Sequence, residues 1–89
     1  MSYRVEVSPE AQKEIRALSG YVCAQALQIL RELQTDPRPA RSKELRGKPD
    51  IYRIWLAKIW RIVYTIDEDA MHVWVLRVRR KEDIDYESL

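Results

Sequence analysis

Two arginines occupy matching places in a repeated phrase of this sequence. Tyr52-Arg53-Ile54 is followed, eight residues on, by Trp60-Arg61-Ile62. Side chains alternate between the two faces of a β-strand, so an arginine framed by apolar residues points away from both of its neighbours. A guanidinium group binds phosphate oxygens through two hydrogen bonds at once. Two arginines aimed from neighbouring strands would therefore form a cationic surface suited to phosphate groups.

The positive charge is concentrated in one part of the chain. The 89 residues include 16 basic and 14 acidic side chains, a formal net charge of only +2. Residues 38–61 nevertheless contain eight basic residues against Glu44 and Asp50, a surplus of +6, whereas residues 1–37 contain four basic and five acidic residues, or −1. A local positive field of this kind attracts polyanions.

The composition favours one small domain over residues 1–89, with a single core and a broad, open site. Cys23 is the only cysteine and His72 the only histidine, so we expect neither a disulfide nor a metal site, and Cys23 is interpreted as a small core residue. The N-terminus lacks the apolar run of a signal peptide, and no stretch approaches the roughly 20 apolar residues of a membrane span. We expect a cytoplasmic protein with no cofactor and no membrane partner.

The first half of the chain predicts a strand and two helices. Residues 3–7 alternate polar and apolar side chains, and Ser8-Pro9-Glu10 then supplies a helix cap, a first-turn proline and an acid. Gly20 is expected to cap the end of this helix. A second apolar stripe runs from residue 21 to about 33, before the prolines at 37 and 39. Residues 38–49 are then expected to form a basic surface loop.

The second half predicts strands at 51–56, 59–66 and 71–78, because these segments are rich in Ile, Val, Trp and Tyr. Their short connections imply antiparallel hairpins. The predicted fold is α+β: an N-terminal strand, a two-helix antiparallel hairpin and a three-strand antiparallel meander, with the helices packed on one sheet face.

Alternation assigns the strand residues to two faces. Even-numbered positions are apolar and are expected to face the helices: Tyr52, Ile54, Leu56, Trp60, Ile62, Tyr64 and Ile66. The opposite face is expected to hold Arg53, Trp55, Arg61, Val63, Thr65, Val73, Val75, Arg77, Arg79 and Lys81. Burying an unpaired guanidinium is costly, and a small domain has no second layer, so we expect this face to be open. By the same alternation His72 points toward the helices.

An open face of this composition suits a phosphate backbone, and an exposed indole such as Trp55 can stack on an unpaired base. Arg46, Lys48, Arg77, Arg79 and Arg80 are further candidates for contact with nucleic acid. The alternative is ordinary: charged residues are common on the solvent face of a sheet, and Arg77 or Arg79 would then pair with nearby acids. The tail after Arg80 also permits two interpretations, either mutual neutralisation of its charges or delivery of Lys81 and Tyr86 to the rim of the basic face.

The ordered segments of the chain resemble the RelE/ParE superfamily of bacterial toxins from toxin–antitoxin pairs. The resemblance rests on Ser8-Pro9-Glu10-Ala11, Leu45-Arg46-Gly47, Tyr52-Arg53-Ile54, Trp60-Arg61-Ile62-Val63-Tyr64 and Arg79-Arg80-Lys81-Glu82, and covers nearly the whole chain. RelE-like members cut messenger RNA in the ribosomal A site, whereas ParE-like members inhibit DNA gyrase. The segment from Leu45 to Tyr52 and the cationic tail look closer to the RelE branch.

The resemblance implies a metal-independent endoribonuclease in which the RNA 2′-hydroxyl attacks the adjacent phosphorus. Arg61 matches the arginine that holds the scissile phosphate, Arg53 a basic residue of the preceding strand, and Tyr86 the tyrosine that stacks on the substrate base. The tail arginine of the family falls on Lys81 or Arg80. It also implies a cognate antitoxin bound in a hetero-oligomer.

One position departs from this pattern, because Trp55 stands where RelE has a lysine proposed to transfer a proton. Lys81 becomes the first candidate for that role, since neighbouring arginines would help it release its proton. Glu82 is the second candidate and His72 the third. The alternatives to a nuclease are a gyrase inhibitor of the ParE type, a plain RNA-binding domain or a decayed toxin.

Overall fold

The computed structural model describes residues 2–84. The elements in chain order are β1 (Arg4–Val7), α1 (Pro9–Arg16), α2 (Gly20–Thr35), β2 (Lys43–Glu44), β3 (Ile51–Leu56), β4 (Trp60–Asp67), β5 (His72–Arg80) and the 3₁₀ turn η1 (Lys81–Asp83). In residues 2–84, no helix is both long and apolar enough to cross a membrane.

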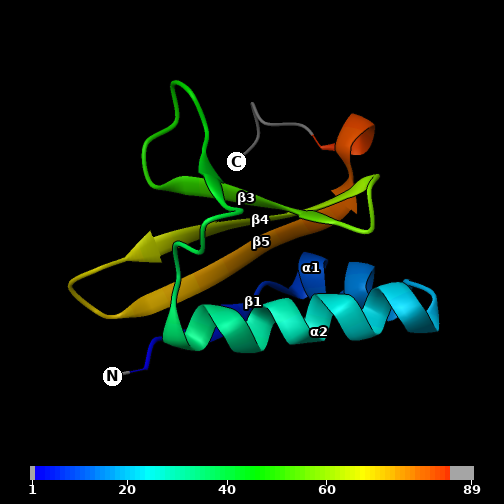
Figure 1. Cartoon of the computed structure of the whole chain (residues 1–89), viewed down its shortest axis with the longest axis horizontal. Helices are drawn as coiled ribbons and strands as arrows, with labels where there is room; N and C mark the ends of the chain where they lie inside the picture. The colour runs from blue at the N-terminus through cyan, green and yellow to red at the C-terminus, as the bar shows by residue number, and fades with distance from the viewer. Residues whose placement is uncertain (1, 85–89) are drawn as a thin grey trace.

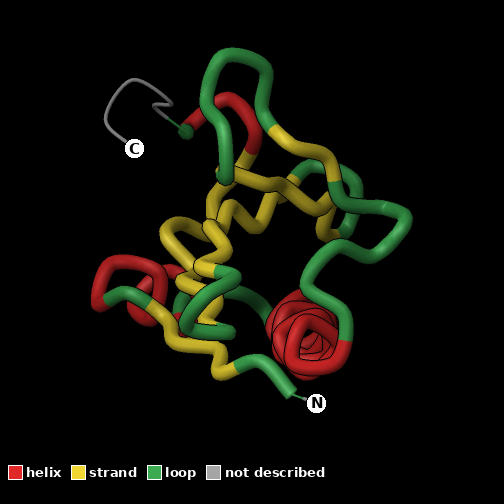
Figure 2. The backbone as a smooth tube through the Cα atoms, turned by 90° about the vertical axis from the view of Figure 1, so that its left-hand side faces the viewer, coloured by secondary structure: helices red, strands yellow, loops and turns green. Residues whose placement is uncertain are grey.

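The five strands form one mixed sheet in the order β1-β5-β4-β3-β2. The meander of β3, β4 and β5 is antiparallel, as predicted, whereas β1 runs parallel to β5. The two helices connect β1 to β2 at the opposite edge of the sheet. Figure 1 shows α1 and α2 below β3, β4 and β5, with β1 behind α2, and Figure 2 shows the sheet curling over the long helix α2, seen end-on. The predicted α+β fold with helices on one sheet face is confirmed.

Helix α1 begins as the sequence predicts. The hydroxyl of Ser8 accepts a hydrogen bond from the backbone N–H of Ala11 at 3.1 Å, and Pro9 is the first helical residue. The prediction that Gly20 caps the end of this helix is wrong: α1 ends at Arg16, and Gly20 is the first residue of α2. Ser19 is the residue directly before α2, so Ser19 and Gly20 stand at the start of the second helix and not at the end of the first.

The core lies between the helices and the even-numbered positions of β3 and β4. Ala11 and Ile15 of α1 and Ala26, Ile29 and Leu33 of α2 are all buried. They pack with residues that the alternation assigned to this face: Tyr52, Ile54, Leu56, Ile62, Tyr64, Ile66 and, partly buried, Trp60. Cys23 is also partly buried and packs against this cluster, as predicted.

Strict alternation fails in β5 because the strand contains a bulge. Val63 lies opposite Arg77, but the next residue of β4, Tyr64, lies opposite Val75, so Leu76 is the extra residue. A bulge of this kind shifts the remaining side chains of the strand to the other face. Arg77 and Arg79 therefore lie on the face away from the helices, as predicted.

The same bulge overturns three face assignments. Val73 and Val75 were expected on the open face, but both are fully buried in the core with Val78. His72 was expected to face the helices, yet it lies opposite Asp67 on the other face. Its imidazole is partly buried there, 3.3 Å from a carboxylate oxygen of Glu6 and edge-on to Trp74.

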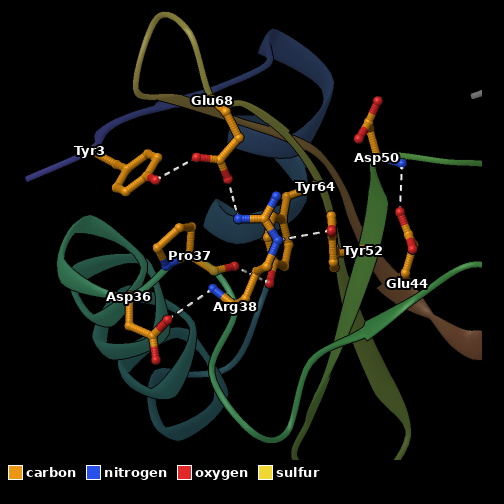
Figure 3. Close-up of polar contacts among 9 residues, drawn as sticks. All are labelled: Tyr3, Asp36, Pro37, Arg38, Glu44, Asp50, Tyr52, Tyr64 and Glu68. Atoms are coloured by element: carbon orange, nitrogen blue, oxygen red, sulfur yellow. Dashed lines mark hydrogen bonds and ion pairs between the residues drawn. The ribbon is translucent and has the colours of Figure 1, made fainter.

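Residues 38–49 are not simply a loop, because Lys43 and Glu44 form the short strand β2 against β3. A polar network fixes the start of this segment at one end of the sheet (Figure 3). Arg38 donates to the hydroxyl of Tyr52 at 2.9 Å and pairs with the carboxylate of Glu68, which accepts a hydrogen bond from Tyr3 at 2.7 Å. The network joins the N-terminus, β3 and the β4–β5 turn to the basic segment.

Tyr64 anchors the same segment from inside the core. Its hydroxyl donates to the carbonyl of Pro37 at 2.8 Å, and its ring stacks on Tyr52 with centroids 5.7 Å apart. Burial raises the pKa of Tyr64 to about 12, so the phenol stays protonated and continues to donate at neutral pH.

We predict that Tyr64→Phe lowers the free energy of unfolding by about 1–3 kcal/mol, because it leaves the Pro37 carbonyl without its buried donor. Urea unfolding followed by tryptophan fluorescence measures the change. Tyr21→Phe is the matched control, since Tyr21 is exposed and should change stability by less than about 0.5 kcal/mol. Equal effects of the two substitutions would contradict the anchoring role.

We also predict that the network around Glu68 is lost in acid. Hydrogen bonds from Tyr3 and Arg38 lower the pKa of Glu68 below its usual range. A lowered folded pKa contributes stability above the unfolded pKa of about 4.3, and this contribution disappears as the pH falls through the folded value. Between pH 7 and pH about 3, Glu68→Gln should therefore lose less stability than the wild type in urea titrations. Glu10→Gln, with the same charge change on an exposed helix turn, should follow the wild type.

Candidate nucleic-acid interface

The face of the sheet away from the helices carries its residues in cross-strand rows. One row contains Trp55, Arg61 and Arg79, and the next contains Lys43, Arg53, Val63 and Arg77. Neighbouring rows lie about 7 Å apart, since each is two residues further along the strands. That separation is comparable with the spacing of successive phosphates in an extended single strand. The predicted gathering of Arg53, Trp55, Arg61, Arg77 and Arg79 on one face is present.

Arg61, Trp55 and Lys81 form a close cluster in the first row. The guanidinium carbon of Arg61 lies 4.3 Å from the centre of the Trp55 ring, and the ammonium of Lys81 lies 5.9 Å from the same centre. Cation–π attraction of this kind strengthens as the cation loses water. Trp55 thus holds two cations, and its indole is not a bare platform for a base.

A shallow pocket opens beside this cluster. Its volume is about 260 Å³, and it is lined by Trp55, Lys58, Ile59, Arg80, Lys81 and Glu82. Three of these side chains are basic and one is an aromatic ring that is 45% exposed. The pocket therefore offers charge and an apolar wall to a ligand bound next to Arg61.

The prediction that the whole face is open is wrong at the central strand. Arg61 is only 7% exposed and Val63 is fully buried. Val63 lies between Arg53 and Arg77 in its row, and these longer side chains flank it on both sides. A small residue between long ones is shielded from water even without a second layer. The cationic groups are accessible at the edges of the rows more than at their centre.

Arg77 and Arg79 are paired with an acidic residue, as the alternative interpretation of the sequence expected. Both pair with Glu14 of α1, at 3.6 and 3.1 Å. Arg80 pairs with Asp83 at 3.0 Å and lies at 3.7 Å from Glu82. Within residues 2–84, Arg53 and Lys81 form no ion pair with an acidic side chain.

Two further predicted residues, Arg46 and Lys48, are not part of the cluster around Trp55. Arg46 is exposed and Lys48 half-buried, in the turn between β2 and β3 where Gly47 has a φ of +77°. Tyr86 lies outside the described residues. Among the described side chains, no group of three or more His, Cys, Asp or Glu residues is placed to hold a metal ion.

Geometry ranks the candidates for proton transfer. Lys81 and Glu82 both line the pocket beside Trp55. His72 lies opposite Asp67, six residues along β4 from Arg61, which corresponds to about 20 Å. The third candidate, His72, is therefore too far from Arg61 to act on the same phosphate.

Two contributors were missed by sequence reasoning. Lys58 was counted among the eight basic residues of 38–61 but not assigned to the site, although it stands in the β3–β4 turn and lines the pocket beside Trp55. Ala57 and Lys58 both have positive φ angles, as expected of a tight turn. The aromatic-rich strands on either side of this turn were the signal that could have placed Lys58 at the site. Glu14 had no signal in the sequence, because its contact with β5 spans 64 residues.

We predict that Trp55 and Arg61 are energetically coupled. A double-mutant cycle of Trp55→Ala and Arg61→Ala should give a coupling energy of about 0.5–2 kcal/mol in urea unfolding, the range of cation–π pairs from exposed to desolvated. The control cycle combines Arg61→Ala with Trp74→Ala, because Trp74 lies opposite Thr65, four residues along β4. Its coupling should be close to zero, and coupling of similar size in both cycles would refute a specific contact.

Comparison with known proteins places this arrangement in a family. Residues 5–84 match the family described as the ParE toxin of the type II toxin–antitoxin system parDE. No curated protein gives a significant sequence match.

Among solved structures, a mutant of E. coli RelE in the free state is 33% identical, with a TM-score of 0.82, and the match covers 99% of this chain and 93% of that one. The intact E. coli RelBE toxin–antitoxin complex is also 33% identical, with a TM-score of 0.78 over 89% of this chain and 96% of that one. The YoeB/ParE toxin from Agrobacterium tumefaciens shares the fold at 11% identity, with a TM-score of 0.77 over 86% of this chain and 96% of that one. The chain therefore belongs to the RelE/ParE superfamily of toxins from type II toxin–antitoxin systems.

Proposed function

We propose that this toxin is a metal-independent endoribonuclease that cleaves messenger RNA in the ribosomal A site, and that it acts in the cytoplasm. The observation that carries the proposal is the cluster of Arg61, Trp55 and Lys81 beside a shallow basic pocket. The identity of 33% to E. coli RelE over most of both chains supports the same branch of the superfamily.

In the proposed reaction the RNA supplies its own nucleophile. The 2′-oxygen forms a bond to the adjacent phosphorus while the bond from phosphorus to the 5′-oxygen breaks, which leaves a cyclic phosphate and a free 5′-hydroxyl. Negative charge grows on the phosphoryl oxygens in the transition state. Arg61 stabilises that charge, because it is held by Trp55 in a poorly solvated position where an electrostatic contact is strong.

A proton must leave the 2′-hydroxyl and another must reach the departing 5′-oxygen. We assign proton transfer to Lys81, with Glu82 as the alternative, because both line the pocket next to Trp55. In its unprotonated form this group accepts the proton of the 2′-hydroxyl and then donates it to the departing 5′-oxygen, so that it ends in the form in which it began. Arg53 contacts the phosphate one row away, and Tyr86 stacks on the substrate base. Arg46, Lys48, Arg77, Arg79 and Arg80 are proposed as peripheral contacts with RNA.

We further propose a cognate antitoxin as the partner that silences the toxin in a hetero-oligomer. Related RelE chains have been solved with the antitoxin RelB, in E. coli and in the archaeon Pyrococcus horikoshii. An antitoxin that covers the cationic face would block RNA from reaching it.

Inhibition of DNA gyrase is the second candidate function. It is favoured by the match to the ParE family and by the ion pairs that already neutralise Arg77 and Arg79. A toxin of that type needs a surface for docking a protein and no catalytic group. A plain RNA-binding domain would use the same basic rows without cleavage.

We predict that Arg61→Ala lowers the rate of messenger RNA cleavage by on the order of 100-fold or more, the usual effect of removing a charge stabiliser. Wild type and variant are expressed in cells, and the 5′ ends of transcripts are mapped. The wild type should produce discrete cuts within translated regions, and the variant should not.

Because Arg61 is buried, its variants must also be shown to fold by circular dichroism and urea unfolding. Arg31→Ala is the matched control, since it removes the same charge from the exposed face of α2 and should leave cleavage unchanged. Retained cleavage by a folded Arg61→Ala protein would rule out the assigned role. DNA breaks with intact transcripts in the wild type would support the gyrase alternative instead.

A further inference from the structure

Glu14 of α1 holds three donors of β5 at once. One carboxylate oxygen accepts a hydrogen bond from the backbone N–H of Val78 at 2.9 Å. The other lies 3.1 Å from Nε of Arg79 and 3.6 Å from Nη2 of Arg77. The side chain is only 19% exposed, so water and salt screen these contacts less than they screen a surface ion pair.

The topology explains why an acid is needed at this place. Strand β1 pairs only with the first part of β5, from His72 to Val75, and the chain then turns into α1. The outer edge of β5 beyond the bulge therefore has no neighbouring strand, and its backbone groups need other partners. The hydroxyl of Ser8 donates to the carbonyl of Leu76, and Glu14 accepts from Val78.

The same carboxylate draws Arg77 and Arg79 toward this edge. Both arginines belong by register to the cationic rows, next to Val63 and Arg61. A guanidinium paired with Glu14 must break or share that ion pair before it can bind a phosphate oxygen. The rows therefore contain more cations than are available to a ligand.

We propose that Glu14 is a positioning residue that competes with RNA for Arg77 and Arg79 and so makes their phosphate contacts weaker than those of Arg53, Arg61 and Lys81. This inference rests on the proposed function as far as the ligand is RNA. If Glu14 competes in this way, the protein binds nucleic acid less tightly than the number of cations on this face would allow. The affinity is then limited by an acidic residue of α1, which lies outside the site.

The test is the binding of a labelled, short single-stranded 2′-O-methyl RNA, which lacks the nucleophilic hydroxyl and is not cleaved. Fluorescence anisotropy gives the affinity at several salt concentrations. Glu14→Gln removes the charge but keeps an amide oxygen that can accept from the Val78 N–H. Each arginine that it releases onto a phosphate should steepen the slope of log affinity against log salt by about 0.7, and tighten binding about fivefold at roughly 0.1 M salt.

Glu10→Gln is the matched control, because it makes the same change in net charge one helical turn earlier and, among the described residues, Glu10 forms no ion pair with an arginine. It should leave the salt slope unchanged. Combining Glu14→Gln with Arg77→Gln and Arg79→Gln should abolish the gain, because the released cations are then absent. Urea unfolding checks that each variant is folded.

A second comparison leaves Glu14 intact. Arg79→Gln should weaken binding less than Arg53→Gln, because Arg79 is already held by Glu14 and Arg53 is not. If the wild type binds RNA but Glu14→Gln matches it in affinity and slope, or if Arg79→Gln weakens binding as much as Arg53→Gln, competition by Glu14 is refuted while the nuclease proposal stands. If neither the wild type nor Glu14→Gln binds RNA at low salt, both proposals fail.

Discussion

Strand β5 must bury Val73, Val75 and Val78 against the helices and still direct Arg77 and Arg79 to the opposite face, and simple alternation cannot do both. The extra residue at Leu76 resolves this conflict by changing the alternation partway along the strand. The junction between β1 and α1 holds the bulge, since the backbone N–H of Ser8 donates to Val75 and its hydroxyl donates to Leu76. The core and the cationic rows both depend on this one irregularity.

The central strand shows how a small sheet keeps an arginine in a poorly solvated place. Burying a guanidinium is costly unless it gains strong contacts. Arg61 lies against the ring of Trp55, directly opposite it in β3, so that dispersion and cation–π attraction offset part of the lost hydration. The result is a cation whose direction is set by the strand register and by a rigid ring. That is the kind of preorganisation that a charged transition state requires.

Two arginines of this face form ion pairs with an acid of the helical layer. Glu14 belongs to α1, yet its carboxylate meets the arginines of β5, because α1 lies along the strand edge that β1 leaves uncovered. At the other end of the sheet, Glu68 and Arg38 link the N-terminus to the basic segment by the same kind of contact. Polar contacts from outside the rows therefore hold two of the arginines of this face and fix the start of the segment that spans residues 38–49.

The sequence alone predicted the α+β fold, the start of α1 at Pro9, the exact bounds of β3 and the core positions of β3 and β4. These features depend on capping residues, alternation and turn lengths, which are signals formed by residues close together in the sequence. The same alternation correctly placed Arg53, Trp55 and Arg61 on one face. The capping signal failed at Gly20, because a glycine that can end a helix can also stand at the start of the next one.

Only the tertiary structure decided the bulge at Leu76, and with it the places of Val73, Val75 and His72. A bulge depends on how two strands pair, and the residues of one strand alone do not determine that pairing. The pairing of Glu14 with Arg77 and Arg79 and the stacking of Arg61 on Trp55 likewise join residues from different elements. The sequence determined which cations share a face, and the packing of α1 and β3 against the strands decided which of them are held by an acid, which by a ring, and which remain available to a ligand.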